Sequence, residues 1–122
     1  MKAIKNTLLA VVCILSLVNC KVEEVDKITI ELHETITNSE SYEYDLNVSG
    51  DEQGATILTQ AQHYQKSEII SNANINWNTL YQYVPASNFV GTDYVEIERC
   101  AGTGENSCSA VDIIKIYITV TD

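Results

Sequence analysis

The stretch that decides the fold of this chain is Val111-Asp112-Ile113-Ile114-Lys115-Ile116-Tyr117-Ile118-Thr119-Val120. Branched apolar residues alternate with more polar ones along its second half. Because successive side chains of an extended strand point to opposite faces, this alternation predicts a half-buried β-strand. The residues predicted to face the core are Ile114, Ile116, Ile118 and Val120. The residues predicted to face outward are Lys115, Tyr117 and Thr119.

The same period of two recurs upstream of this strand. It predicts strands at 28–32, 42–48, 55–58, 68–70, 74–84 and 94–99. In the first of them Ile28, Ile30 and Leu32 share one face. Pro85 ends a strand because proline lacks a backbone donor, and the strand at 94–99 forms a hairpin with the last one. Seven short strands without a helical pattern after the N-terminus predict an all-β fold, an antiparallel β-sandwich.

The N-terminus has the pattern of a helical secretory signal. Lys2 and Lys5 precede an apolar run over 8–18, which at roughly 11 residues is shorter than the about 20 needed to span a membrane. Its end, Leu17-Val18-Asn19-Cys20, resembles the lipobox of bacterial lipoproteins. The resemblance implies a signal peptide at 1–19 and lipid attachment to Cys20. The alternative is an ordinary signal peptide in which the cysteine is coincidental.

Residues 20–27 are predicted to form an acidic tether. They contain Lys21-Val22-Glu23-Glu24-Val25-Asp26, which resembles the signal that exports some lipoproteins to the outside of the outer membrane; a solvated linker is the alternative. The lipid anchor implies a cell-envelope protein held at the outer membrane and exposed at the surface, with the membrane as its first partner. The predicted sandwich domain occupies 28–122.

The charge of the chain restricts its partners. All 17 acidic residues follow the predicted cleavage site and five of the seven basic ones do, so the processed chain carries a net charge of −12. Phosphate binding needs a basic face, so no nucleic-acid partner is expected. An anionic bilayer would also repel the domain, and the lipid therefore has to supply the anchoring.

The cysteines divide by position. Cys13 lies in the signal peptide and Cys20 is the lipidation site, which leaves Cys100 and Cys108 as a pair in an exported chain. An oxidising compartment favours a disulfide between them. A metal or redox pair is disfavoured, because there is no Cys-x-x-Cys spacing and no histidine nearby in the sequence.

The segment from Tyr83 to Asp93, Tyr83-Val84-Pro85-Ala86-Ser87-Asn88-Phe89-Val90-Gly91-Thr92-Asp93, resembles the Tyr-x-Pro-x-x-x-Phe-x-Gly-Thr-Asp signature of bacterial Ig-like, cadherin-like domains. The resemblance covers about residues 42 to 121. It implies an Ig-like sandwich used for adhesion or partner binding. Phe89 would plug the sandwich beneath a crossing loop, and Gly91 would permit a turn that other residues resist.

Few residues carry a pattern typical of catalysis or metal binding. His33 and His63 are predicted at the surface, and no serine-nucleophile motif is present. Asp93, Glu96 and Glu98 invite a calcium interpretation, but the calcium-binding linker of cadherin-like domains is missing, and Glu96 and Glu98 more simply form the solvent side of a strand. No metal, no other cofactor and no enzymatic activity are expected.

The remaining candidate site is aromatic. Trp77, Tyr81 and Tyr83 have a spacing that puts all three on one face of a strand, where they could stack on sugar rings or pack in the core. The core is favoured. The expected function is a non-catalytic adhesion or binding module for a protein or glycan ligand. The alternatives are a structural subunit of an envelope assembly that uses an exposed edge strand, and a secreted inhibitor or small enzyme; an inhibitor would use the loop at 101–107.

Overall fold

The structure is a computed structural model that describes residues 27–49, 54–72, 78–100 and 110–122. The described residues contain no helix. The seven strands are β1 (Lys27–Thr37), β2 (Tyr42–Ser49), β3 (Gly54–Thr59), β4 (Tyr64–Asn72), β5 (Asn78–Pro85), β6 (Gly91–Cys100) and β7 (Val111–Thr121). A strand is found at each predicted place within the described residues, and β1 and β4 extend well beyond the stretches that alternate most clearly; the part of the strand predicted at 74–84 that precedes Asn78 lies outside the described residues.

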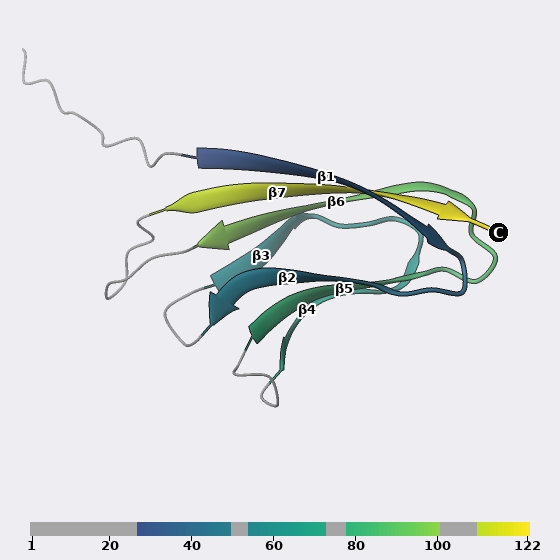
Figure 1. Cartoon of the computed structure of the whole chain (residues 1–122), viewed down its shortest axis with the longest axis horizontal. Helices are drawn as coiled ribbons and strands as arrows, with labels where there is room; N and C mark the ends of the chain where they lie inside the picture. The colour runs from purple at the N-terminus through teal and green to yellow at the C-terminus, as the bar shows by residue number, and fades with distance from the viewer. Residues whose placement is uncertain (1–26, 50–53, 73–77, 101–109) are drawn as a thin grey trace, which may run out of the picture.

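The strands form two sheets. Sheet A has the order β1-β7-β6-β3 and sheet B the order β2-β5-β4. In Figure 1, β1, β7 and β6 lie above β2, β5 and β4, so the molecule is a two-layer β-sandwich. The predicted hairpin is confirmed, since β6 and β7 pair without interruption from Gly91↔Val120 to Cys100↔Val111.

One pairing corrects the prediction of a purely antiparallel sandwich. β1 runs parallel to β7, in register from Lys27↔Val111 to Thr37↔Thr121, whereas the other four strand pairs are antiparallel. The physical reason is that the chain crosses from sheet A to sheet B directly after β1. β1 therefore cannot form a hairpin with β2, and its backbone groups pair with the distant C-terminal strand instead.

The core lies between the sheets and takes side chains from both. Its buried apolar residues are Leu46, Val48, Ala61, Tyr81, Tyr83, Val95, Ile97, Ile114, Ile116, Ile118 and Val120. The four residues of β7 predicted to face the core are at most 1% exposed, which confirms that face. Full burial of each such side chain contributes about 1.5–3 kcal/mol.

The edge strand β1 is less buried than the alternation predicts. Ile28 shares a face with Ile30 and Leu32, yet it is 60% exposed because it lies at the start of an edge strand. Farther along the same face Glu34 pairs with Ile118 and points toward the interior. Burial first, and then Glu34, raise the pKa of Tyr42 on the facing sheet to about 12. An inward-pointing charge is one way in which natural sheet edges resist pairing with other chains.

The connection from β5 to β6 is held by local contacts. Phe89 is partly buried and packs against the core, and its backbone N–H donates to the carbonyl of Ala86 at 3.0 Å. Asn88 has φ 61° and Gly91 has φ 146°. A Cβ on Gly91 would lie 3.2 Å from the Phe89 ring, so Gly91 is required both for its backbone conformation and for the space beside Phe89.

Several predictions concern residues outside the described ranges. They include the signal peptide, Cys20, residues 21–26 of the acidic tether, Trp77, the loop at 101–107 and Cys108; Lys27, the last residue of the predicted tether, begins β1. Cys100, at the end of β6, is disulfide-bonded; Cys108 as its partner stays a prediction. Within the described ranges, no helix has the length and apolarity that crossing a membrane requires.

Candidate functional site

Asp93 is a buried carboxylate on the inward face of β6. It is 3% exposed, and its two oxygens are both used. Oδ1 accepts from the backbone N–H of Gln62 at 2.8 Å and of Tyr94 at 2.9 Å. Oδ2 accepts from the backbone N–H of His63 at 2.8 Å and lies 3.0 Å from the Tyr83 hydroxyl. Asp93 therefore ties the β3–β4 connection of the sandwich to β6.

These contacts determine the charge states of Asp93 and of the neighbouring Tyr83. Burial alone would raise the pKa of Asp93, but hydrogen bonds from three backbone N–H groups and from the Tyr83 hydroxyl outweigh burial and hold that pKa below its usual value. Burial and the neighbouring Asp93 carboxylate raise the pKa of Tyr83. At neutral pH the site is thus a carboxylate beside a protonated phenol.

The structure does not bring the three carboxylates of the calcium interpretation together. Asp93 points inward, whereas Glu96 and Glu98 lie on the opposite, outward face of β6, where they alternate with buried Val95 and Ile97. Among the described residues, no group of three or more histidine, cysteine, aspartate or glutamate side chains could hold a metal ion.

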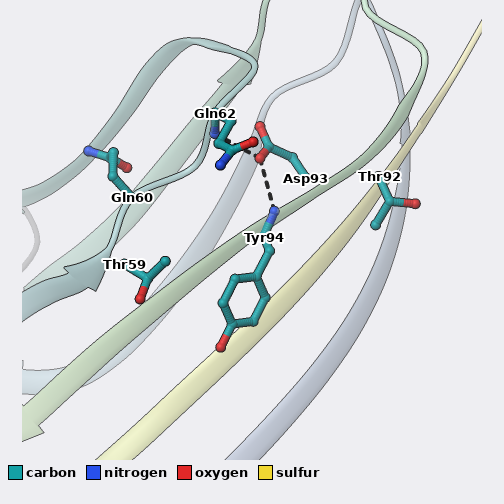
Figure 2. Close-up of a pocket in the computed structure, with 6 residues that line it drawn as sticks. All are labelled: Thr59, Gln60, Gln62, Thr92, Asp93 and Tyr94. Carbon is teal, nitrogen blue, oxygen red and sulfur yellow. Dashed lines mark hydrogen bonds between the residues drawn. The ribbon is translucent and has the colours of Figure 1, made fainter.

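A depression of about 170 Å³ opens beside Asp93 on the surface of sheet A. We call it the Tyr94 depression, and Figure 2 shows the residues that line it: Thr59, Gln60, Gln62, Thr92, Asp93 and Tyr94. The end of β3 and the β3–β4 connection supply the first three, and the beginning of β6 supplies the others. In this view the Tyr94 ring is seen face-on beside Thr59, so one side of the depression is aromatic.

The polar side chains of the Tyr94 depression are not equally available to a ligand. The Gln60 amide is largely used, because its oxygen accepts from Ala61 N–H at 2.9 Å and from the Ser67 hydroxyl, while its nitrogen donates to the Ser67 carbonyl at 3.1 Å. Within the described part of the chain, the side chains of three lining residues form no hydrogen bond. These three are Thr59, Gln62 and Thr92.

Ser67 is buried beneath this region and is held in a structural hydrogen-bond network. Its hydroxyl lies 2.7 Å from the hydroxyl of Tyr81 and 2.5 Å from the amide oxygen of Gln60. Burial raises the pKa of Tyr81 to about 12, so that its phenol stays protonated. The neighbours of the Ser67 hydroxyl are thus a phenol and an amide, which position it without making it a nucleophile.

An aromatic row continues from the Tyr94 depression across the outer face of sheet A. The ring of Tyr94 lies 4.9 Å from that of Tyr117, and the ring of Tyr117 is stacked on that of His33 at 4.8 Å. These spacings match the distance between neighbouring strands, so the three rings form one ladder over β6, β7 and β1. We call His33, Tyr117 and Tyr94 the aromatic row.

Carboxylates hold both ends of the aromatic row. The Tyr94 hydroxyl donates to Glu96 at 2.6 Å, and His33 Nε2 lies 2.7 Å from Glu31. Burial and the hydrogen bond to Glu96 raise the pKa of Tyr94. The ring of Tyr94 is therefore fixed in place by its hydroxyl at one end and by Tyr117 at its side.

The aromatic residues singled out from the sequence lie elsewhere. Tyr81 and Tyr83 are 0% exposed and belong to the core, so neither is available to a ligand, and Trp77 lies outside the described ranges. The sequence did hold a signal for the aromatic row. Tyr117 was predicted to face outward, and in a hairpin closed between Cys100 and Val111 the residue opposite Tyr117 is Tyr94.

A second buried charge lies at the opposite end of β6. Arg99 donates to Asp112 through Nε at 3.0 Å and also through its terminal nitrogen, and Arg99 donates to the Leu46 carbonyl of sheet B at 3.0 Å. Both side chains are at most 15% exposed. This pair links the two sheets and has no connection to the Tyr94 depression.

No family model matches the chain, and no curated protein matches it. Several solved structures are similar to it in fold. A 2,6-sialyltransferase from a Photobacterium species has a TM-score of 0.48 and 13% identity, over 80% of this chain and 19% of the enzyme. The cysteine protease inhibitor EhICP2 of Entamoeba histolytica has a TM-score of 0.47 and 10% identity, over 77% of this chain and 96% of the inhibitor. Plasmodium falciparum protein Pf12p has a TM-score of 0.42 and 12% identity, over 76% of this chain and 42% of Pf12p.

Proposed function

We propose that this chain is a non-catalytic binding module of the cell envelope, anchored through a lipid on Cys20 and built as an Ig-like sandwich. The observation that carries the proposal is the aromatic row and its adjoining Tyr94 depression on the outer face of sheet A. A surface that combines partly exposed aromatic rings with unpaired polar side chains has the composition of a recognition site.

The scaffold beneath this surface supports a binding role. The three rings project from paired strands, and the connection that lines the depression is fixed to β6 by the hydrogen bonds of Asp93. Side chains held by strands lose little freedom when a ligand binds, so less of the interaction free energy is lost to ordering. The site is thus organised before a ligand arrives.

The envelope location is supported by the sequence. The apolar run before Leu17-Val18-Asn19-Cys20 resembles a lipoprotein signal, and a net charge of −12 after cleavage makes a lipid the natural attachment to a membrane. Labelling of cells with radioactive palmitate tests this part. The chain is expected to incorporate label, and Cys20→Ser is expected to abolish incorporation; label that persists in the Cys20→Ser chain would contradict the anchor.

An array experiment tests the binding role. The lipoprotein, purified in detergent, is applied to a glycan array and to a protein array. Binding on at least one array is expected, with at least a ten-fold loss in Tyr94→Ala. Tyr64→Ala is the matched control, because Tyr64 is a 39% exposed tyrosine at the start of β4 in sheet B. Absence of binding on both arrays, or equal loss in both variants, would refute the proposal.

The second candidate function is a structural subunit of an envelope assembly. It is favoured by the exposure of Ile28 at the start of edge strand β1, where an added strand could pair. Native gels of solubilised envelopes separate the two functions. A structural subunit is expected to migrate in a large complex that dissociates when Ile28→Lys is introduced. A free binding module is expected to migrate at the size of the lipoprotein alone.

A further inference from the structure

The size of the Tyr94 depression limits what it can hold. Its volume of about 170 Å³ is below the about 300–1,000 Å³ typical of pockets for drug-sized ligands. A single six-membered ring with its substituents is an appropriate occupant, and longer molecules would have to extend outward over the surface of sheet A.

One wall of the depression fits an apolar ring face. The centroid of the Tyr94 ring lies 4.9 Å from that of Tyr117, with the two rings tilted by 42°, and the Tyr94 hydroxyl donates to Glu96 at 2.6 Å. In Figure 2 the ring is seen nearly face-on, beside Thr59. A flat, fixed aromatic face stacks with a ligand at low entropic cost. The C–H face of a pyranose ring has the matching shape and polarity.

The other walls offer hydrogen bonds of both kinds. The hydroxyls of Thr59 and Thr92 donate and accept, and the amide of Gln62 has two donors and one acceptor oxygen. These side chains form no hydrogen bond within the described ranges, so a ligand that excludes water from them has to supply partners. Sugar hydroxyls, which also donate and accept, supply them without a fixed charge.

The charges around the depression disfavour ionic ligands. Its six lining residues include no lysine or arginine, Asp93 is one of them, and the Glu96 carboxylate accepts from the hydroxyl of the lining residue Tyr94. An anion would meet the like charge of Asp93 without a basic residue in the lining. A cation would find Asp93 already saturated by four hydrogen-bond donors and Glu96 bound to the Tyr94 hydroxyl.

From these four properties we infer that the Tyr94 depression binds one uncharged pyranose residue of a glycan, stacked on Tyr94 and hydrogen-bonded by Thr59, Gln62 and Thr92. This inference rests on the proposed binding function and names the class of its ligand. The rest of the glycan extends over the aromatic row toward Tyr117 and His33.

Ligand-detected NMR with the lipoprotein in detergent tests the inference. The probes are the methyl glycosides of glucose, galactose and mannose, N-acetylglucosamine, and glucuronic acid as the charged comparison. At least one uncharged probe is expected to receive saturation, most strongly at its ring C–H protons. Glucuronic acid is expected to bind at least ten-fold more weakly.

Variants assign the binding to this depression. Tyr94→Ala is expected to weaken binding of the uncharged probe at least ten-fold, and Tyr64→Ala is expected to leave it unchanged. Because loss of the Tyr94 ring could disturb Tyr117, Gln62→Ala is the second variant. Its side chain is exposed, so the thermal midpoint is expected to stay that of the wild type while binding weakens three- to ten-fold.

The outcomes separate the inference from the proposed function. If no uncharged probe binds, if glucuronic acid binds as tightly, or if both Tyr94→Ala and Gln62→Ala bind like the wild type, the sugar inference is overturned. The binding function survives that result when the protein array shows an interaction that Tyr94→Ala abolishes. If neither array shows binding, the proposed function falls as well.

Discussion

Asp93→Asn is the substitution that tests most directly how this sandwich is held together. The change keeps the size of the side chain but replaces one carboxylate oxygen by an NH₂ group. An NH₂ group in place of Oδ1 faces two donors, the N–H groups of Gln62 and Tyr94. In place of Oδ2 it faces one fixed donor, the His63 N–H, because the Tyr83 hydroxyl can accept from it and donate to the His63 carbonyl at 2.9 Å. The buried network is therefore broken without a cavity being made.

The magnitude follows from the number of bonds lost. At least one hydrogen bond to the carboxylate is removed, which contributes about 1.5–3 kcal/mol, and the remaining bonds weaken because they now go to a neutral amide. We expect the free energy of unfolding to fall by about 3 kcal/mol, out of a total that is typically about 5–15 kcal/mol. With a urea dependence of about 1.5 kcal/mol per molar, the midpoint moves down by about 2 M.

Urea unfolding followed by tyrosine and tryptophan fluorescence measures this shift, and repetition at several pH values tests its electrostatic cause. The pKa of Asp93 is depressed in the folded protein, so its stabilisation is present above the unfolded value of about 3.9 and is lost as pH falls through the folded pKa. The wild type and Asp93→Asn should therefore converge in stability below about pH 4. An unchanged midpoint at pH 7, or a difference that persists undiminished in acid, would refute the assignment.

Two further predictions concern the frame around the site. Gly91→Ala should lower the free energy of unfolding by about 1–3 kcal/mol, because alanine would have to adopt a positive φ with its Cβ against the Phe89 ring. Gly54→Ala is the control, since there is open space around Gly54, and it should change the urea midpoint little. Equal effects of the two substitutions would contradict the explanation. Asp112→Ala should destabilise by about 3–5 kcal/mol, because it leaves the Arg99 guanidinium buried without its carboxylate. The double variant Arg99→Met/Asp112→Leu should recover much of that loss in the same urea assay, and failure to recover would show that the hydrogen bond from Arg99 to sheet B matters more than the ion pair.

Alternation along single strands made most of the fold predictable. The pattern of β7 placed Ile114, Ile116, Ile118 and Val120 in the core, and the structure confirms all four. Strand existence and the β6–β7 hairpin are local properties, since they depend on neighbouring side chains and one short connection. Residues such as Gly91 were also predictable, because a turn conformation is set within a few residues.

The candidate site depends on contacts between distant parts of the chain. Asp93 is 31 positions from Gln62 and 30 from His63, and no spacing pattern in the sequence links them. The parallel pairing of β1 with β7 is equally non-local. It brings His33 beside Tyr117, although most of the sequence lies between these two residues. Such pairings are decided only when the two sheets close around the core.

The sequence by itself determined which residues share a face of each strand and, where only one face is apolar as in the second half of β7, which face is inside; elsewhere the tertiary structure decided it. In β5 both faces contain apolar side chains, so alternation could not tell whether Tyr81 and Tyr83 or Leu80 and Val84 would be buried. Sheet B buries the tyrosines because their hydroxyls find Ser67 and Asp93 as partners within the sandwich. The exposed aromatic surface therefore lies on sheet A, since a strand's period fixes relative orientation and only packing against a second sheet fixes inside and outside.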